Sequence, residues 1–408
     1  MIRIPFLLLI TLMAFTTPNA AIAIEIPSAD IEFLGTPYAD DYHHTEEAYA
    51  RNVWDLQFYQ GLLFIGAGNS SNIGPATNAG PVRIRYFDPA GEQFVNEGIA
   101  REEQIDRFRI LNDSLYIPGH DPLANWSLGN FYSRLPEGQW VMYRNIPGAI
   151  HNYDMAVYKG RMYAALGISG GAAVAVSNDN GGSWSNFSVG RSRSYTFLQS
   201  RGKLYATKKI TDDNYQVSNG FSSIWELEGD GEFVPRPDLF DRILFPDTDF
   251  DETGSMKIVR SVAVRWKNVY IGGYIHNDHQ ARPFGLYIAH TLERGVVHIT
   301  AVRAPTGMVP MDLLLRDDYI YALYVKPAYN GNYRVFVRRA SVRKLWQWLP
   351  YLSFTAAALP RSFEESSGDF YFGLGTEVAE PTNWTLSELN SNAGGILRIK
   401  AEAITKNE

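Results

Sequence analysis

The stretch from His151 to Trp184 alternates short apolar runs with turn residues, and this pattern predicts consecutive antiparallel strands. A first apolar run, DMAVYK, ends at a Lys-Gly turn, and two more runs follow, RMYAALG and GGAAVAV. A polar segment, SNDNGGSW, then leads toward a fourth strand. Short apolar runs separated by Gly, Asn and Asp turns are typical of a β-meander and not of helices.

The second strand of this unit recurs along the chain, which predicts a repeat architecture. Its pattern is a turn, an apolar residue, an aromatic residue and then small or apolar residues. The aromatic position recurs at intervals of 52, 47, 42, 65, 51 and 50 residues, at Phe64, Tyr116, Tyr163, Tyr205, Tyr270, Tyr321 and Tyr371. Each interval has room for about four strands. The sequence therefore predicts an all-β fold, a seven-bladed β-propeller of four-stranded antiparallel blades, and disfavours an open sandwich.

The repeat also predicts how the chain is organised. The 65-residue interval indicates an insertion at about 229–255, which we expect to be a surface loop beside the fifth blade. A strand at Ile31–Leu34 is expected to complete the blade that ends at Gly394–Lys400, which would close the ring. The sequence contains no low-complexity tract or linker. Residues 24–408 are therefore predicted to form a single propeller domain.

Residues 1–23 have the pattern of a secretory signal peptide. Arg3 precedes an apolar run from Ile4 to Phe15, and small residues end the segment at Ala21-Ile22-Ala23. The apolar run is shorter than a membrane-spanning helix requires. We therefore expect an exported protein, secreted or periplasmic, with no membrane anchor once the signal is cleaved.

Composition narrows the classes of partner. The chain has no cysteine, so an exported protein of this sequence depends on its core and not on disulfides. The formal net charge of −7 disfavours a nucleic-acid-binding protein. A local cationic pocket is still compatible with an acidic chain. We expect a monomer that binds no nucleic acid.

The segment Ser177–Trp184 fits the pattern S-x-D-x-G-x-[ST]-W, known as the Asp-box. It resembles turns in the propellers of sialidases and of many secreted carbohydrate-active proteins. An Asp carboxylate can accept hydrogen bonds from its own turn, glycines permit positive φ, and a Trp can pack beneath the hairpin. We therefore interpret Asp179 as a structural residue of the turn, and not as a catalytic acid or a metal ligand.

Titratable residues gather at the predicted mouth of the ring. In a propeller, the start of each first strand and the end of each second strand meet at one face around the central axis. Structural positions there would carry Val, Ile and small residues. Blades two to five instead carry, at or next to those positions, Asp106, His120, Asp121, His151, Tyr153, Arg193, Tyr195, Lys208, Lys209, Arg260 and His276. Burying several cations together is costly unless an anion binds there, so the pattern predicts an anion-binding site.

Such a cluster suits a lyase that cleaves a uronate-containing polysaccharide by β-elimination. A cation must neutralise the uronate carboxylate, a base must remove the adjacent proton, and an acid must protonate the leaving oxygen. Lys208, Lys209 and Arg260 suit the first role, and His120 or His151 with Tyr195 suit the other two. Which of these residues is the base stays open. Arg193, Tyr153, Asp106 and His276 are further candidates for contacts with the substrate.

The order of these residues resembles the propeller-type ulvan lyases. Those enzymes are exported seven-bladed propellers that place His, His, Tyr and a basic residue around a central canyon. His120, His151, Tyr195 and Lys208 or Lys209 repeat that order, and His276 matches a further histidine that helps to hold the carboxylate. The family's basic residue is Arg, whereas this chain has Lys. The resemblance implies a secreted lyase that acts on an anionic polysaccharide such as ulvan.

Two other functions are compatible with the sequence. A sialidase-like glycoside hydrolase would need three arginines, a Tyr–Glu pair and an acidic Asp, and the early F/Y-R-I-P motif of that family is missing. A non-catalytic glycan-binding propeller would need only aromatic platforms, for which Trp54 and Trp126 are candidates. We expect no required cofactor. A structural divalent cation stays possible, because His276-Asn277-Asp278-His279 has suitable residue types without a diagnostic spacing.

Overall fold

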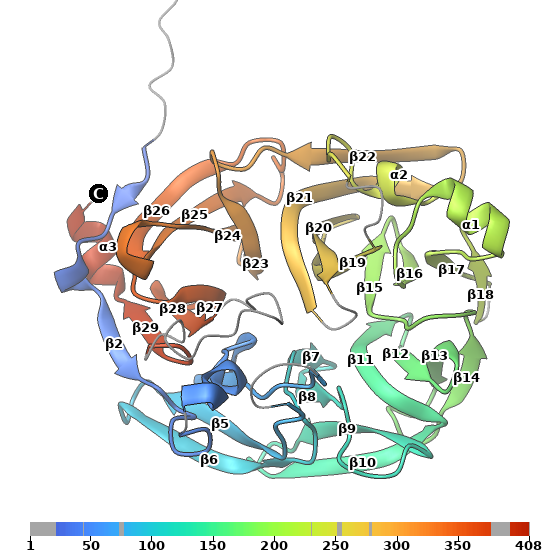
Figure 1. Ribbon diagram of the computed structural model, residues 1–408, viewed down its shortest axis with the longest axis horizontal. Helices are drawn as coiled ribbons and strands as arrows, with labels where there is room; N and C mark the ends of the chain where they lie inside the picture. The colour runs from blue at the N-terminus through green and yellow to red at the C-terminus, as the bar shows by residue number, and fades with distance from the viewer. Residues whose placement is uncertain are drawn as a thin grey trace, which may run out of the picture.

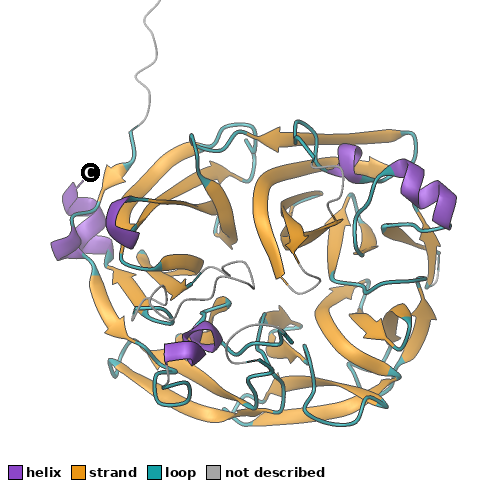
Figure 2. Cartoon of the chain, viewed as in Figure 1, coloured by secondary structure: helices purple, strands orange, loops and turns teal. Residues whose placement is uncertain are grey.

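The computed structural model describes residues 22–43, 45–72, 77–229, 231–250, 255–276, 280–376 and 392–407. Within these residues, seven sheets stand in a ring around a central axis (Figure 1). Strands make up nearly all of the ring, and the few helices lie at its periphery or on its face (Figure 2). The predicted seven-bladed β-propeller is therefore confirmed. The predicted signal peptide, residues 1–23, lies almost wholly outside the described residues.

The first four blades follow one another along the chain, each with four antiparallel strands. Blade 1 contains β3 (Asp55–Tyr59), β4 (Leu62–Gly66), β5 (Val82–Asp88) and β6 (Gln93–Ala100). Blade 2 contains β7 (Arg109–Leu111), β8 (Ser114–Pro118), β9 (Leu128–Arg134) and β10 (Trp140–Pro147). Blade 3 contains β11 (Ala149–Tyr158), β12 (Arg161–Ile168), β13 (Gly171–Ser177) and β14 (Ser185–Ser188). Blade 4 contains β15 (Thr196–Ser200), β16 (Lys203–Thr207), β17 (Ile224–Glu228) and β18 (Glu232–Pro235).

The last three blades complete the ring, and two of them use residues from the N-terminal end. Blade 5 contains β19 (Ser255–Val264), β20 (Lys267–His276), β21 (Gln280–Glu293) and β22 (Val296–Val302). Blade 6 contains β23 (Val309–Arg316), β24 (Tyr319–Pro327), β25 (Tyr333–Ser341) and β26 (Leu349–Ala356), with β1 (Ile24–Glu25) added in parallel. Blade 7 contains β27 (Leu359–Ser366), β28 (Asp369–Gly375), β29 (Ile396–Ile399) and β2 (Glu32–Gly35).

Short helices connect or flank the blades. Within the described residues, the α-helices are α1 (Asp213–Asn219), α2 (Asp241–Leu244) and α3 (Ala401–Asn407). The 3-10 segments in the same residues are η1 (Ser28–Asp30), η2 (Thr45–Arg51) and η3 (Tyr329–Gly331). None of the helices in the described part of the chain is both long and apolar enough to cross a membrane.

Blade 7 is closed by the two ends of the chain, as the sequence predicts. Strand β2 pairs antiparallel with β29, with Glu32 opposite Arg398 and Phe33 opposite Leu397. The Arg398 guanidinium reinforces this pairing by donating to Glu32 Oε2 at 2.7 Å. The strand from the N-terminal end therefore forms the outer edge of the last blade (Figure 1).

The interval assigned to an insertion, 229–255, differs from the prediction. Its early part includes β18, the fourth strand of blade 4, which pairs with β17. The connection that follows contains α2 and buries Leu239, Leu244 and Phe245 completely. It therefore packs against the neighbouring blades and is not simply a loop on the surface. The prediction failed because a four-residue strand with a Pro at its end has little periodic signal.

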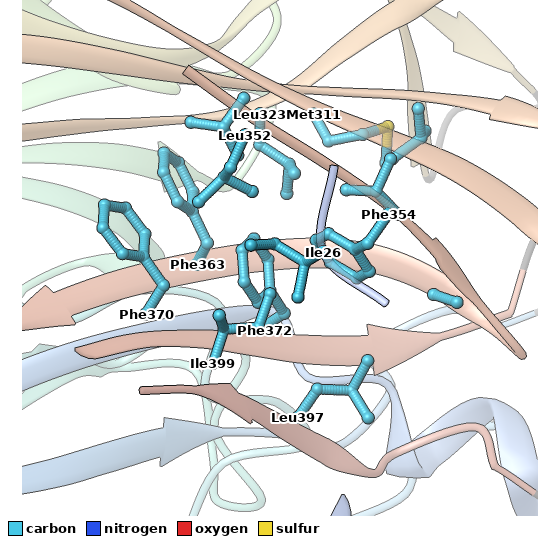
Figure 3. Close-up of a cluster of buried hydrophobic side chains, with 14 of the residues drawn as sticks. Ile26, Met311, Leu323, Leu352, Phe354, Phe363, Phe370, Phe372, Leu397 and Ile399 are labelled. Carbon is cyan, nitrogen blue, oxygen red and sulfur yellow. The ribbon is translucent and has the colours of Figure 1, made fainter. Parts of the chain in front are cut away.

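The repeated aromatic residues explain why the blades form. All seven lie on the second strand of a blade or its equivalent, and all are less than one-tenth exposed. Neighbouring blades bury such residues against each other, and each large apolar side chain contributes about 1.5–3 kcal/mol when fully buried. Figure 3 shows this packing between blades 6 and 7, where Ile26 from the N-terminal end joins Phe354, Phe363 and Phe372.

A ring of polar side chains ties the innermost strands together. Nine positions before each repeated aromatic stands a polar residue, and we call this set the inter-blade belt: Asp55, Arg107, Asp154, Thr196, Ser261, Asp312 and Ser362. Three of its carboxylates accept a hydrogen bond from a backbone N–H of the next blade. Asp55 accepts from Phe108 at 2.7 Å, Asp154 from Phe197 at 3.2 Å, and Asp312 from Phe363 at 3.1 Å.

The other belt contacts cross the remaining blade junctions. Arg107 pairs with Asp154 at 3.0 Å, and Ser261 Oγ donates to the Phe197 carbonyl at 2.7 Å. Ser362 Oγ donates to the Val53 carbonyl at 3.0 Å, and Arg260 donates to Asp312 at 3.1 Å. Every junction of the ring is thus crossed by a hydrogen bond or an ion pair at this level.

The Asp179 turn joins β13 to β14 on the outer side of blade 3. Asp179 Oδ1 accepts from the Ser183 backbone N–H at 2.8 Å, and the Ser177 and Ser183 hydroxyls each donate to its carboxylate at 2.7 Å. These bonds lower the pKa of Asp179 to about 2. Trp184 packs edge-on against Phe131, with 5.7 Å between ring centroids. Asp179 therefore has the structural environment expected of a turn residue.

Candidate functional site

A pocket of about 390 Å³ opens at the centre of the ring. Most of its lining residues come from blades 2 to 5. Seven of the predicted site residues line it: Asp106, His120, His151, Tyr153, Arg193, Tyr195 and Arg260. Lys257 also lines it and is not predicted from the sequence. The structure therefore brings most of the predicted site residues together in one cavity.

Tyr153 is the centre of this cluster. Its ring centroid lies 4.9 Å from that of His120, 5.2 Å from that of His151 and 5.1 Å from that of Tyr195. The Tyr153 hydroxyl accepts a hydrogen bond from Arg193 Nη1 at 2.7 Å. The three residues predicted to be catalytic are thus all in contact with one ring, and all three line the same pocket.

The hydrogen bonds of His151 determine its tautomer. Nδ1 lies 3.1 Å from the backbone carbonyl of His120, which can only accept, so Nδ1 carries the proton. The same nitrogen lies 3.4 Å from Asp121 Oδ2. Burial, followed by the charge of Arg193, lowers the pKa of His151 to about 3. The imidazole is therefore neutral near pH 7, with an unprotonated Nε2 available as a proton acceptor.

Gly167 makes room for this arrangement. It lies opposite His151 in the pairing of β11 with β12. A Cβ atom at this position would come within 2.8 Å of His151 Cδ2 and 3.3 Å of Arg193 Cγ. A side chain there would push one of these two residues aside, which explains why a glycine stands next to the last residue of β12.

His120 is also neutral near pH 7. Burial is the main cause that lowers its pKa to about 4, although the nearby Asp106 acts in the opposite direction. Burial opposes ionisation of Asp106. The positive charges of His120, which is protonated at the low pH where Asp106 titrates, and of Arg260 and Arg107 outweigh burial and hold the pKa of Asp106 at about 2. Gln104 Nε2 donates to Asp106 Oδ1 at 3.0 Å. The site thus contains two neutral imidazoles beside an ionised carboxylate.

Two cations stand next to the pocket's tyrosines. Arg193 donates to Tyr153, and Lys257 Nζ lies 4.9 Å from the ring centroid of Tyr195. Burial lowers the pKa of Lys257 to about 8. Arg260 lies deeper in the ring, where it donates to Asp312 and to the backbone carbonyl of Trp54. Arg193 and Lys257 are therefore better placed than Arg260 to meet a ligand carboxylate.

Lys257 was missed because the inner strand of blade 5 is irregular. In a regular strand, residues three apart face opposite sides, so Lys257 and Arg260 would not share a pocket. The pairing of β19 with β20 shifts register between Ile258 and Arg260, and this bulge turns both side chains toward the axis. A bulge leaves no reliable signal in a single sequence.

The assignment of Lys208 to substrate binding is wrong for its position. Its side chain is 1% exposed, and Nζ donates to the carbonyls of Val189 at 2.6 Å and Arg191 at 3.0 Å. The same nitrogen lies 4.4 Å from the ring centroid of Phe221. Through these two hydrogen bonds, Lys208 connects blade 4 to the segment that leads to Arg193, so its role is structural.

The other two predicted contacts are not found in the pocket. Lys209 is half-buried and does not belong to the part of its lining that the structure describes. His276 is the last residue of β20, and its side chain lies outside the described part of the chain. The cations that line the pocket from blades 4 and 5 are instead Arg193, Lys257 and Arg260.

Replacing Lys208 with methionine is expected to lower the free energy of unfolding by about 1–3 kcal/mol. The substitution keeps most of the apolar volume but leaves the Val189 and Arg191 carbonyls without their donor. Urea denaturation measures the loss. Because the ammonium does not face the pocket, the salt dependence of anion binding should stay unchanged, whereas Lys257→Met should weaken it. If Lys208→Met leaves the free energy of unfolding unchanged and weakens the salt dependence of anion binding, Lys208 does not have this structural role.

No group of three or more His, Asp or Glu side chains within the described ranges is placed to hold a metal ion. Asn277, Asp278 and His279 lie outside those ranges. The possible divalent cation of the sequence analysis therefore stays a prediction.

Comparison with known proteins identifies the fold and no family. No family model matches this chain, and no curated protein matches it by sequence. Among solved structures, it is similar to the WD40 repeats of RRP9, with 11% identity over 92% of this chain and 98% of that one and a TM-score of 0.51. The β-propeller domain of the Trilobed protease from Pyrococcus furiosus matches with 10% identity, 80% and 91% coverage and a TM-score of 0.45. At such identities the likeness shows the propeller fold alone.

Proposed function

We propose that this protein is an exported polysaccharide lyase that cleaves an anionic, uronate-containing polysaccharide of the ulvan type by β-elimination. The observation that carries the proposal is the environment of His151. Its neutral imidazole offers Nε2 as a base, and cations stand beside it that can neutralise a carboxylate. Removal of the proton next to a carboxylate requires both an unprotonated base and a positive charge that neutralises the carboxylate, and this site offers both.

The residues take the following roles. Arg193 and Lys257 bind the uronate carboxylate, which makes the proton on the adjacent C5 removable. His151 Nε2 takes that proton, and the electron pair of the broken C–H bond forms the C4=C5 double bond. Asp121, 3.4 Å from His151 Nδ1, stabilises the imidazolium that results.

Tyr195 completes the reaction as the acid. Its hydroxyl protonates the glycosidic oxygen as the C4–O bond breaks, so the polymer leaves as an alcohol. The ammonium of Lys257, 4.9 Å from the ring centroid, stabilises the phenolate that is left. His120 contacts Tyr153 edge-on and fixes the base through its backbone carbonyl, so we assign it a positioning role.

A sialidase-like hydrolase is a second candidate because four arginines line the pocket: Arg107, Arg193, Arg260 and Arg361. Such enzymes bind a substrate carboxylate with three arginines. Here Arg107 is paired with Asp154, Arg260 with Asp312, and Arg361 donates to Asn52 Oδ1 at 3.1 Å. Much of their hydrogen-bonding capacity is therefore already used inside the ring, which favours the lyase.

The test is to incubate the purified protein with ulvan, alginate, pectin and a glycosaminoglycan and to follow the ultraviolet band of the unsaturated uronate. We expect a rise with at least one polymer and its loss in Tyr195→Phe. Release of a free acidic sugar from a sialoside, with no rise on any polymer, would favour the hydrolase. Binding of a polymer without any product would favour a non-catalytic glycan-binding propeller.

Activity is expected to fall as the pH rises through about 8. Burial lowers the pKa of Lys257 to about 8, so its ammonium is present below that pH and is lost above it. An arginine at this position keeps its charge throughout. Lys257→Arg should therefore shift the alkaline limb of kcat/KM to higher pH, as measured from about pH 6 to about pH 10. The same alkaline limb in both proteins would exclude Lys257 as the titrating group.

A further inference from the structure

An exposed tryptophan stands at the rim of the pocket. Trp126 is 63% exposed, although it lies in the short connection between β8 and β9 that also lines the cavity. Asn125 holds this connection in place, because its Oδ1 accepts from Arg144 Nη2 at 2.8 Å and from Ser127 Oγ at 2.6 Å. The indole is thus presented to solvent by a braced loop. A large apolar face kept exposed beside a polar cavity indicates a binding surface.

The two sides of the pocket differ in charge. The side formed by blades 4 and 5 carries the cations Arg193, Lys257 and Arg260. The side formed by blades 1 and 2, next to Trp126, carries Arg107, which is paired with Asp154. Its other polar side chains are neutral amides, a hydroxyl and three carboxylates: Ser70, Asn72, Asn78, Gln104, Glu103, Asp106 and Asp121.

Two of these carboxylates, Glu103 and Asp121, lie close to each other. The Glu103 backbone N–H donates to the Asp121 carbonyl at 2.9 Å. Burial first, and then the charge of Asp121, raise the pKa of Glu103 to about 7, so its carboxylate is fully charged only above that pH. Asp106, with a pKa of about 2, is ionised throughout the neutral range. This side of the pocket therefore repels anions most strongly above about pH 7, and it offers hydrogen bonds to hydroxyl groups.

We infer that the sugar next to the bound uronate carries no charge, and that it stacks on Trp126 against the blade 1–2 wall. The inference rests on the proposed function, because it takes the uronate to be the group on the cationic side. A sugar ring presents C–H groups on its faces and hydroxyls at its edge, which suits an indole face beside Asn and Gln side chains. A sulfate or a second carboxylate at this place would meet Glu103 and Asp121.

The inference therefore narrows the proposed substrate to a polymer in which uronates alternate with uncharged sugars, as in desulfated ulvan, and disfavours sulfated native ulvan. A homopolymer of uronates places a carboxylate next to the carboxylates of the wall. A sulfated polymer places a sulfate there. Like charges brought together at a binding surface lower affinity strongly, by at least about tenfold.

The first experiment tests the platform. Trp126→Ala is compared with Trp346→Ala, an indole that is 71% exposed in the turn between β25 and β26 and outside the pocket lining. Affinity for desulfated ulvan is measured by calorimetry, which needs no turnover. We expect Trp126→Ala to weaken binding by about tenfold and Trp346→Ala to leave it unchanged. If the two variants bind desulfated ulvan with equal affinity, the sugar does not stack on Trp126.

The second experiment tests the charge of the neighbouring sugar. Binding of native ulvan, desulfated ulvan and alginate is measured for the natural protein, Glu103→Gln and the exposed control Glu137→Gln. We expect desulfated ulvan to bind best to the natural protein. Glu103→Gln, but not Glu137→Gln, should reduce the difference in affinity between desulfated ulvan and the other two polymers. Equal or tighter binding of the sulfated or all-uronate polymer would overturn the inference. Because binding is the readout, preference for desulfated ulvan without cleavage would reject the lyase reaction and keep the charge inference.

Discussion

Replacing His151 with asparagine is expected to lower kcat by about 10²–10⁴-fold, the usual contribution of a general base. The amide nitrogen of asparagine can take the place of Nδ1 and donate to the His120 carbonyl, as the imidazole does at 3.1 Å. No atom then replaces Nε2. The fold and the cationic side of the pocket are kept, so KM for the polymer should change much less than kcat. Steady-state kinetics on the preferred polymer measures both.

A histidine outside the pocket provides the control. His290 in β21 stacks on His298, with 4.5 Å between ring centroids, and does not line the cavity. His290→Asn should leave kcat unchanged. If His151→Asn keeps more than about a tenth of the natural kcat, His151 is not the base, and Tyr195 would have to perform both proton transfers.

Removing the carboxylate of Asp154 is expected to cost about 3–5 kcal/mol of stability, as for other buried ion pairs that lose one partner. Asp154 is 1% exposed and pairs with Arg107 at 3.0 Å and Arg109 at 2.7 Å. It also accepts from the Phe197 backbone N–H at 3.2 Å. In Asp154→Ala, two guanidinium groups, two backbone N–H groups and the Thr196 hydroxyl each lose an acceptor at the junction of three blades. Urea denaturation followed by fluorescence measures the loss.

Two further variants test whether the loss of stability in Asp154→Ala comes from its buried ion pairs. Glu228→Ala removes an exposed partner of Arg294, and it should change stability by less than about 1 kcal/mol. Asp154→Asn keeps the shape and part of the hydrogen bonding, so it should fall between the natural protein and Asp154→Ala. Burial opposes ionisation of Asp154, but Arg109 and Arg107 hold its pKa at about 2, below the ordinary value of 3.8. The stabilisation is therefore present above about pH 4 and is lost as the pH falls toward 2.

The sequence was sufficient to predict the fold because the repeat is carried by large buried residues. Seven aromatics at similar intervals mark seven second strands, and each packs against a neighbouring blade. The same alignment indicated which residues lie at the mouth of the ring, since the repeated aromatic has an equivalent place on the second strand of every blade. It failed for β18, whose four residues carry too little pattern to distinguish a strand from a loop.

The site could be predicted only as far as strand alternation holds. His151 and Tyr153 are two apart and share the pocket, as alternation predicts, although the pairing of β11 with β12 shifts register between Asn152 and Asp154. Lys257 reaches it only through a bulge, and Lys208 is drawn away by carbonyls and an aromatic ring that lie far from it in sequence. The inter-blade belt, by contrast, could have been found. Its polar residues stand nine positions before each repeated aromatic. Each directly follows the residue that the repeat places at the mouth of the ring in that blade, such as Asp106 or Tyr153.

The closure of blade 7 has a consequence for the order in which the molecule can assemble. Hairpins within the first six blades bring together residues that are near in sequence, whereas Glu32 and Arg398 are 366 positions apart. Bringing such distant residues together costs more chain entropy and is slow compared with local pairing. During synthesis, six blades can therefore form before β29, the pairing partner of β2, has been synthesised. The seventh blade is the last to form, and until then β29 is an open edge to which a strand from another molecule could add.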